Sequence, residues 1–338
     1  MKPFTKRLSM IVAAALVTAS LTACSTKTGG SAASDYPTKP FIVTAPSGAG
    51  GGWDKTARSL TKVLGESKLI KETMTVENKP GGGGTVFLAN YVTKDSNDPY
   101  KLFVSSPPIL INNLKKEGNS PQGYKDVTPL AQLTKDYGAI AVPADSKYKD
   151  LKSLVADIKA DPSKITLAGG SAPGSMDHLI SVLPAFKSGV DPKKVKYLSY
   201  DGGGEAVAAL LGKNADAIGT DISSLGSYLK SGKIRILAVT SPERMGGIFK
   251  DIPTLKEQGM DSQFVIWRGV FGPKGMTADQ VKFWDTTLKS LSENETWKKE
   301  LVANDWESEY RGSADFKTFL AQQEKDVQEL LTALNMQK

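Results

Sequence analysis

The stretch that decides the fold runs from Phe41-Ile42-Val43-Thr44-Ala45-Pro46 into Ser47-Gly48-Ala49-Gly50-Gly51-Gly52-Trp53-Asp54. An apolar run of strand length enters a glycine-rich turn, and Ala57, Leu60 and Leu64 then follow at helical spacing. Glycines let a backbone approach a ligand closely, and the first N–H groups of a helix have no internal partners and carry the positive end of its dipole. The pattern predicts an anion site at the start of a helix, although a tight turn without a ligand satisfies it too.

Two further stretches repeat this pattern. Residues 164–168 lead into the turn 169–175, Gly-Gly-Ser-Ala-Pro-Gly-Ser, and residues 195–200 lead into 201–205, Asp-Gly-Gly-Gly-Glu. A helical pattern follows each turn. Three glycine turns of one kind make a ligand site at their common edge more probable than a single turn would.

Apolar runs alternate with amphipathic helical patterns through most of the chain, which predicts an α/β fold with mainly parallel sheets. Strands are expected at 41–45, 74–77, 102–105, 139–142, 165–168, 195–200, 215–220, 234–240 and 265–271. The last helical pattern, 313–335, is expected to pack into a core through Phe316, Phe319, Leu320, Val327, Leu330, Leu331 and Leu334.

The N-terminal stretch has the layout of a secretory signal peptide, with Lys2, Lys6 and Arg7 before a short apolar segment. Leu-Thr-Ala-Cys at 21–24 resembles the bacterial lipobox, which implies cleavage after residue 23 and lipidation of Cys24, for example with palmitate. Residues 1–23 are thus a predicted signal peptide, and the small, polar residues of 24–35 a flexible tether. Cys24 is the only cysteine, so a lipidated chain has no disulfide and no thiolate metal ligand.

The formal net charge is +7, and three of these charges belong to Lys2, Lys6 and Arg7. The remaining excess of about +4 suits an anionic ligand or surface. The charges are interleaved rather than blocked, and no aromatic-rich basic stripe is present, so nucleic acid is discounted as a partner.

Motifs of known enzymes are sparse, and a single histidine argues against most metal sites and against serine–histidine–aspartate relays. Ser59 with Lys62 and Ser146 with Lys149 match S-x-x-K, and K-T-G stands at 27–29, so a serine acyl-transferase of the cell wall is an alternative. It is weakened because K-T-G lies in the tether and no S-D-N accompanies it.

Five side chains have two interpretations each. Arg58 and Arg268 present forks that match a carboxylate, or could brace loops, and bracing is favoured for Arg58. Trp53 could wall a pocket or, as its spacing favours, pack in the core; Asp54 could cap its helix or contact a ligand. His178 could donate to a ligand or satisfy its own turn, and the local role is favoured.

Six short motifs occur in one order behind the lipobox. They are Tyr-Pro-Thr-Lys-Pro at 36–40, Gly-Gly-Gly-Trp-Asp at 50–54, Glu-Asn-Lys-Pro-Gly-Gly-Gly-Gly at 77–84, Gly-Ser-Ala-Pro-Gly-Ser at 170–175, Gly-Gly-Gly-Glu-Ala at 202–206 and Asp-Ile-Pro-Thr-Leu at 251–255. Together they resemble the extracytoplasmic solute-binding proteins of tripartite tricarboxylate transporters, over nearly the whole mature chain.

The resemblance implies an α/β, two-lobed fold of the type II periplasmic-binding-protein kind, a flytrap with the ligand cleft between its domains. One lobe is expected at 36–137 with 265–338 and the other at 138–264, with two crossing strands as the hinge. The resemblance implies no catalytic step and no cofactor. It implies a monomer outside the cytoplasm, lipid-anchored to the membrane, that delivers a small organic acid to a large and a small membrane subunit.

The resemblance also implies a ligand site formed largely by backbone amides. Its expected residues in the first lobe are Ser47, Gly48, Ala49, Gly50, Gly51, Asp54, Ser105 and Ser106. Those in the second lobe are Ser171, Gly174, Ser175, Gly203, Gly204, Thr220 and Asp221.

Gly-Gly-Gly-Trp-Asp at 50–54, with Trp-Arg-Gly at 267–269, resembles the branch of the family that binds tricarboxylates, so citrate is the leading ligand. Dicarboxylates, acidic amino acids and aromatic acids are ligands of other members. Asp54 and Asp221 would repel an anion unless they face away from it or bind it through donors. A lipoprotein that senses the same acid for a membrane kinase is an alternative, since both functions need closure on a ligand.

Overall fold

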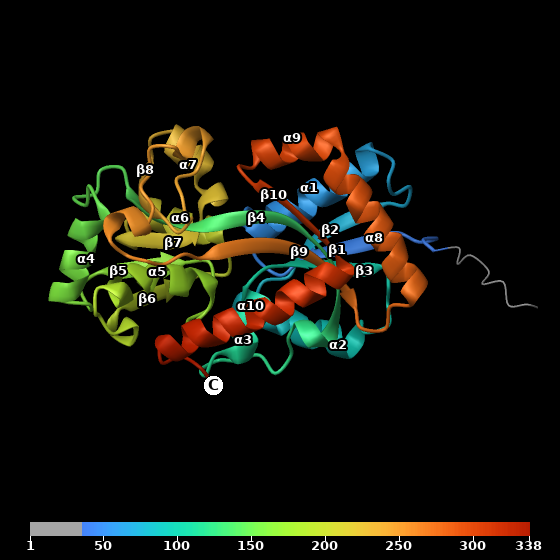
Figure 1. Ribbon diagram of the computed structural model, residues 1–338, viewed down its shortest axis with the longest axis horizontal. Coiled ribbons are helices and arrows are strands. Elements are labelled where there is room, and N and C mark those ends of the chain that lie inside the picture. The colour runs from blue at the N-terminus through green and yellow to red at the C-terminus, as the bar shows by residue number, and fades with distance from the viewer. Residues whose placement is uncertain (1–35) are drawn as a thin grey trace, which may run out of the picture. The chain divides into compact units, whose positions relative to one another are not determined.

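The computed structural model describes residues 36–338, and the predicted signal peptide, tether and lipidation site at Cys24 lie outside them. Residues 37–338 form one compact unit, which is described here by itself. Across the described residues, every helix is too short or too polar to cross a lipid bilayer. The strands follow the order β2-β1-β3-β9-β4-β7-β5-β6, and β10 and β8 also pair with β4 (Figure 1).

Two groups of strands share the long strand β4, Val127–Pro143. The first group holds β1 (Phe41–Ala45), β2 (Met74–Asn78), β3 (Lys101–Ser105), β9 (Val265–Pro273) and β10 (Glu307–Gly312). The second group holds β5 (Thr166–Gly169), β6 (Lys196–Ser199), β7 (Ala217–Asp221) and β8 (Ile234–Val239). β4 pairs with β9 up to Tyr137 and with β7 from Gly138 onward, so the chain changes sheets between these two residues.

Helices cover both groups of strands. They are α1 (Gly52–Glu66), α2 (Thr85–Lys94), α3 (Pro108–Leu114), α4 (Leu151–Ala160), α5 (Met176–Lys187), α6 (Gly203–Leu211), α7 (Gly226–Lys230), α8 (Ala278–Glu293), α9 (Glu295–Ala303) and α10 (Ser313–Ala333). In Figure 1, α4 to α7 surround the second group, while α1, α2, α8 and α9 lie around the first. β4 and β9 run between the two groups, as the two-lobed α/β fold requires.

The expectation of mainly parallel sheets is wrong. β1 pairs in parallel with β2 and β3, and β5 pairs in parallel with β6 and β7. Every pairing of β4 and β9 is antiparallel. The parallel units come from the strand–turn–helix repeats, whereas two strands that cross the molecule in opposite directions give antiparallel pairs at its centre.

Two features of the strands were not expected from the sequence. β4 begins at Val127 rather than at residue 139, and its first half contains polar residues that interrupt the apolar run. β10 reads Glu-Ser-Glu-Tyr-Arg-Gly and is only partly buried, because it pairs with β4 on one side. The nine expected strands are present, and apart from the start of β4 their ends differ by a few residues.

The terminal helix packs into the core as expected. Phe316, Leu320 and Leu331 of α10 are fully buried, and the ring of Phe316 meets that of Trp267 edge-on at 5.4 Å between centroids. A Cβ at Gly269 would overlap the Phe316 ring, so β9 is glycine where this helix crosses it. This contact fixes β9, which carries the side chain at the centre of the candidate site, against α10.

Candidate functional site

The three glycine turns meet where β1, β5 and β6 end. Gly51 and Gly202 are the N-cap residues of α1 and α6, and Ser175 is that of α5. The backbone N–H of Gly48 donates to the carbonyl of Asp201 at 3.1 Å, which joins the first turn to the third. Helices of both groups of strands thus direct their N-termini, the positive ends of their dipoles, at one region.

Close backbone packing explains why two positions in these turns are glycine. At Gly170, a Cβ would overlap the backbone of Gly202 and Gly203, so the second and third turns could not touch. At Gly52, a Cβ would overlap the guanidinium of Arg268. The first turn therefore presents bare backbone to an arginine, and the other two present it to each other.

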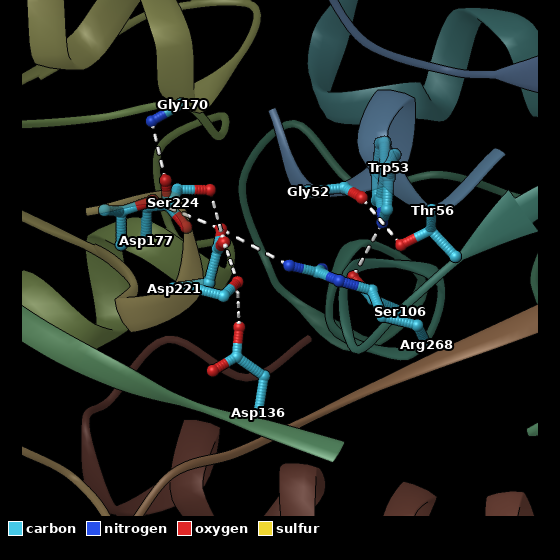
Figure 2. Close-up of polar contacts among 12 residues, drawn as sticks. Gly52, Trp53, Thr56, Ser106, Asp136, Gly170, Asp177, Asp221, Ser224 and Arg268 are labelled. Carbon is cyan, nitrogen blue, oxygen red and sulfur yellow. Dashed lines mark hydrogen bonds and ion pairs between the residues drawn. The ribbon is translucent and has the colours of Figure 1, made fainter. Parts of the chain in front are cut away.

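Arg268, in β9, is the cation at the centre of the site. Only 1% of its surface is exposed, and its Nη2 lies 3.3 Å from Asp221 Oδ1. Figure 2 shows its guanidinium pointing across the site from β9 toward Asp221, past Gly52 and Trp53 of α1. Within residues 36–338, Nε of Arg268 has no hydrogen-bond acceptor, and Nη2 has only its ion pair with Asp221, so Nε is the nitrogen left to bind an anion.

Asp221 ends β7 and is surrounded by donors. The hydroxyl of Ser224 donates to its Oδ2, and the Ser223 hydroxyl lies 3.1 Å from the same oxygen. Burial opposes ionisation, but the Arg268 guanidinium and the Ser224 and Ser223 hydroxyls lower the pKa of Asp221. Asp221 is therefore the ionised partner of Arg268.

Two more buried carboxyl groups lie beside this pair. Asp136, in β4, receives the Ser223 hydroxyl at 2.6 Å, and Asp177, in α5, receives the Gly170 N–H at 2.7 Å. Burial, and then the charge of Asp221, raise the pKa of both, and that of Asp177 to about 7. Three buried acids thus surround one buried arginine. With only one positive charge to offset them, a proton is favoured on Asp136 or Asp177 near neutral pH.

The cleft between the turns has a volume of about 40 Å³. Of the expected site residues, Ser47, Gly51, Ser171, Gly203 and Asp221 line it. The remaining lining residues are Gly52, Trp53, Gly83, Pro108, Gly170, Met176, Asp177, Gly202 and Arg268. The cleft is far smaller than an ordinary ligand pocket, which has a volume of about 300–1,000 Å³. Its small volume indicates that the turns are in a closed arrangement.

The other expected residues of the first turn lie at the contact between the turns or behind it. Gly48 bonds to Asp201, and the carbonyl of Ala49 would lie 3.1 Å from a Cβ at Gly204. Gly50 has a φ of +83°, and its N–H donates to Asp54 Oδ2 at 3.0 Å. These residues shape the first turn and do not line the cleft.

The expected serines and Thr220 have separate positions. Ser106 accepts the Trp53 indole N–H at 2.8 Å, and Ser105 lines a small apolar cavity beside it. Ser175 is fully buried, and its Oγ has no partner within the described residues. Thr220 is buried, and its hydroxyl lies 3.4 Å from Asp221 Oδ1. Gly174 lines a different hollow.

The five side chains with two interpretations are now placed. Asp54 receives Arg58 Nε at 2.9 Å as well as the Gly50 N–H, so both brace the first turn, as favoured for Arg58. Trp53 is half-buried and lines the cleft, so it walls the pocket instead of packing in the core. His178 accepts the Gly174 N–H at 2.8 Å through Nδ1, which is the local role.

Sequence reasoning missed Asp136 and Asp177 and left Arg268 undecided. A charged residue inside the apolar run of β9 was a usable signal for Arg268. Asp177 had a weaker signal, because it stands in the first helical turn after a glycine loop, where an acid also caps a helix. No local pattern marks Asp136, since its neighbours in the site come from β7 and β9.

Both S-x-x-K matches lie outside this site. Ser59 donates to Glu300 Oε2 at 2.7 Å, and Lys62 pairs with Oε1 of the same residue at 2.7 Å. Lys149 donates to the backbone carbonyl of Ser146. Among the described residues neither lysine is hydrogen-bonded to its serine hydroxyl, so the geometry gives the acyl-transferase alternative no support.

Comparison with known proteins decides the family. Residues 57–336 match the model of the tripartite tricarboxylate transporter family receptor, TctC. The chain belongs to this family. The receptor is 29% identical over 309 residues to the UPF0065 protein in the gbd 5′ region of Cupriavidus necator, and the match covers 90% of each chain.

Solved structures share the fold of the receptor. The periplasmic binding protein BugD superposes with a TM-score of 0.80 at 26% identity, covering 90% of the receptor and all of BugD. MatC from Rhodopseudomonas palustris, solved with bound malate, superposes with a TM-score of 0.78 at 22% identity, covering 88% of the receptor and all of MatC. The family is one of solute-binding receptors, and the two-lobed α/β fold expected from the resemblance is confirmed.

Proposed function

We propose that this receptor works outside the cytoplasm, closes on one small carboxylate, and delivers it as a monomer to the large and small membrane subunits of a tripartite transporter. The observation that carries the proposal is the convergence of three helix N-termini on the cleft that Arg268 lines, where Arg268 Nε has no acceptor within residues 36–338. A carboxylate fits the helix N-termini and the guanidinium alike, because backbone N–H groups and guanidinium N–H groups both donate hydrogen bonds to anions.

The proposed lobes are 36–137 with 265–338, and 138–264, joined by β4 and β9. The change of strand partners along β4 after Tyr137 supports this division. A cleft of about 40 Å³ leaves little room for a ligand, so we propose that rotation about these strands opens it. The backbone groups proposed to bind the ligand are those of the expected turn residues that line the cleft, Ser47, Gly51, Ser171 and Gly203.

The proposed ligand is citrate or a related tricarboxylate, on the strength of Gly-Gly-Gly-Trp-Asp at 50–54. The buried acids set a condition for this choice. Asp221 is already paired with Arg268, so added negative charge is tolerated best when Asp177 and Asp136 hold protons. A dicarboxylate such as malate, which MatC holds, or an acidic amino acid, whose ammonium group offsets charge, is the second candidate.

The test is isothermal titration of residues 25–338, stripped of ligand, against citrate, malate, glutamate and nicotinate. Saturable binding of one acid with a matching rise in melting temperature is expected, because a ligand that binds only the folded state stabilises it. Binding of none of the four would remove support for carboxylate capture. Loss of uptake in a deletion strain with signalling intact would favour transport over the sensor alternative.

We also propose that lipid on Cys24 holds the receptor at the membrane. Changing Cys24 to Ala should release the protein into the soluble fraction and leave ligand affinity unchanged, because the described residues that line the ligand cleft all follow residue 46. Fractionation of cells that express each form measures this. Membrane association of the Cys24→Ala chain would contradict the proposal.

A further inference from the structure

A second, larger hollow lies beside the cleft and shares no lining residue with it. Its volume is about 760 Å³, within the range of small-molecule sites. Residues from two parts of the chain line it: Gly82, Thr85, Lys115 to Gly118, Asn335 and Met336 form one wall, and Ala172 to Gly174, His178, Pro192, Lys193, Val195 and Tyr197 form the other. A Cβ at Gly83 would lie 3.3 Å from the backbone nitrogen of Ala172, and this contact separates the hollow from the cleft.

A buried ammonium group faces this hollow. Lys115 follows α3 and is only 2% exposed, and among residues 36–338 it has no ion pair with a carboxylate. Its Nζ donates to the carbonyl of Pro173 at 2.8 Å. An ammonium has three N–H donors, so two of them remain for a group inside the hollow.

Burial lowers the pKa of Lys115, because a charge without a counterion is costly in a low-dielectric environment. An anion in the hollow would relieve this cost. The carbonyl that accepts from Lys115 belongs to the opposite wall of the hollow. Lys115 comes from the segment after α3, and Pro173 comes from the turn before α5. The side chain is thereby held pointing at the space between the two walls.

His178 contributes a neutral donor to the same hollow. Burial, and then the charge of Lys115, lower its pKa to about 4, so the imidazole is uncharged at neutral pH. Its Nδ1 accepts the Gly174 N–H, which places the ring proton on Nε2. The Tyr197 ring packs on the imidazole at 4.4 Å between centroids, and this contact fixes the orientation of His178.

The lining also includes apolar side chains, those of Pro173, Pro192, Val195 and Met336. The other charged lining residues, Lys116, Glu117 and Lys193, are exposed and therefore lie at the rim. One buried positive charge in an apolar surround suits a ligand with one negative charge and an apolar body. It does not suit a tricarboxylate, which would leave two charges without partners.

We propose that this hollow is a second binding site, separate from the ligand cleft, for an aromatic or aliphatic monocarboxylate whose carboxylate pairs with Lys115 Nζ and whose apolar body packs against Pro192, Val195 and Met336. The proposal does not rest on the function proposed for the cleft, because the two spaces share no lining residue.

Two methionines allow the two sites to be distinguished in one experiment. Met336 lines the hollow and Met176 lines the cleft, so ¹³C-methyl methionine signals of residues 25–338 report on each separately. This chain contains the whole compact unit 37–338. Met336→Leu and Met176→Leu assign the two signals. The probes are benzoate, its neutral analogue benzamide, and acetate, which carries the charge without the apolar body.

Benzoate is expected to shift the Met336 signal saturably, and benzamide and acetate to bind at least tenfold more weakly. Lys115→Gln keeps a donor for the Pro173 carbonyl but removes the charge, and it should lower the affinity for benzoate at least tenfold. Lys116→Gln removes an exposed charge one residue away, and it should change the affinity for benzoate less than twofold. Melting curves check that both variants fold, and a Lys115→Arg variant, which keeps the charge, should bind benzoate more tightly than Lys115→Gln.

Three results would overturn the proposal. They are a benzoate shift confined to Met176, an unchanged benzoate affinity in Lys115→Gln, and no saturable shift at Met336. The first would assign benzoate to the cleft and leave carboxylate capture there intact. Failure of citrate and malate to shift Met176, with benzoate still shifting Met336, would instead contradict the proposed function of the cleft alone.

Discussion

Arg268 and Asp221 form the ion pair on which the charge of the cleft depends. Removing one partner of a buried pair strands the other, at a cost of about 3–5 kcal/mol. We therefore expect Arg268→Gln to lower the free energy of unfolding by about this amount and to abolish carboxylate binding, because Asp221, Asp136 and Asp177 then lack their buried counterion.

Asp221→Asn in the Arg268→Gln chain removes the stranded charge and should recover part of that stability. Urea unfolding of the wild type, both single variants and the double variant measures the coupling between the two side chains. Strict additivity would show that the 3.3 Å pair contributes nothing to the fold.

Asp177 makes carboxylate binding depend on pH. Its pKa is raised to about 7, first by burial and then by the charge of Asp221, so it holds a proton below that pH and loses it above. An anion binds better to the protonated form, and we expect affinity for malate to fall by up to about tenfold per pH unit above 7. Malate serves because both of its carboxyl groups are already ionised there.

Titration calorimetry from pH 6 to 9 measures this dependence, and the Asp177→Asn variant should make it shallower, with Asp136 as the remaining buried acid whose pKa is raised. Asp315→Asn, on the exposed start of α10, is the matched control and should leave the profile unchanged. A wild-type affinity that is constant across the range would mean that no buried acid responds to the ligand.

Among the elements, the strand–turn–helix units are the part of the site that could be predicted from the sequence. Ser47, Gly51, Ser171 and Gly203 line the cleft, and their turns could be located because a strand, a glycine turn and a helix are local patterns. The positions of Asp136 and Arg268 were not predictable in the same way. They depend on the register of β4 against β9, where Thr134 lies opposite Arg268, and register is set by packing between distant segments.

The same distinction explains the strand that was missed. β10 carries alternating charged residues and pairs only with β4, so it lacks the apolar run by which buried strands are found. The fold class followed from the repeated strand–turn–helix units. The antiparallel centre did not, because it is formed by β4 and β9, which belong to no such unit.

Gly51 is the N-cap of α1, and a Cβ there would lie 3.3 Å from the backbone nitrogen of Gly203. Its φ of −81° suits any residue, so Gly51→Val should fold normally and yet keep α1 and α6 apart. We expect at least a tenfold loss of carboxylate affinity with little change in melting temperature. Affinity equal to that of the wild type would remove the first turn from the site.

Gly65→Val is the matched control, because this glycine is in the same helix and a Cβ there meets nothing within 4 Å. It should leave affinity unchanged. Gly50→Val is less informative, since a φ of +83° makes a valine strained whether or not the residue contacts a ligand.

For the whole molecule, the proposed opening predicts a change of size on binding. The cleft holds only about 40 Å³ when the turns touch, so the ligand-free receptor should populate a wider arrangement, and a ligand should shift it toward the closed one. Small-angle X-ray scattering with and without a saturating carboxylate measures this as a fall in the radius of gyration. Gly51→Val should not show the fall, and an unchanged radius in the wild type would contradict the proposed hinge.

The shared strand β4 has a consequence for the order in which the chain acquires structure during synthesis. The sheet of β1, β2 and β3 is completed by β9 and β10, which lie more than 150 residues further along the chain. The strands β5 to β8, by contrast, are contiguous and follow β4 directly. During synthesis, the strands β5 to β8 therefore leave the ribosome as a nearly complete unit, before β9 and β10 are available to complete the sheet of β1 to β3. Contacts between segments so far apart in the chain form slowly.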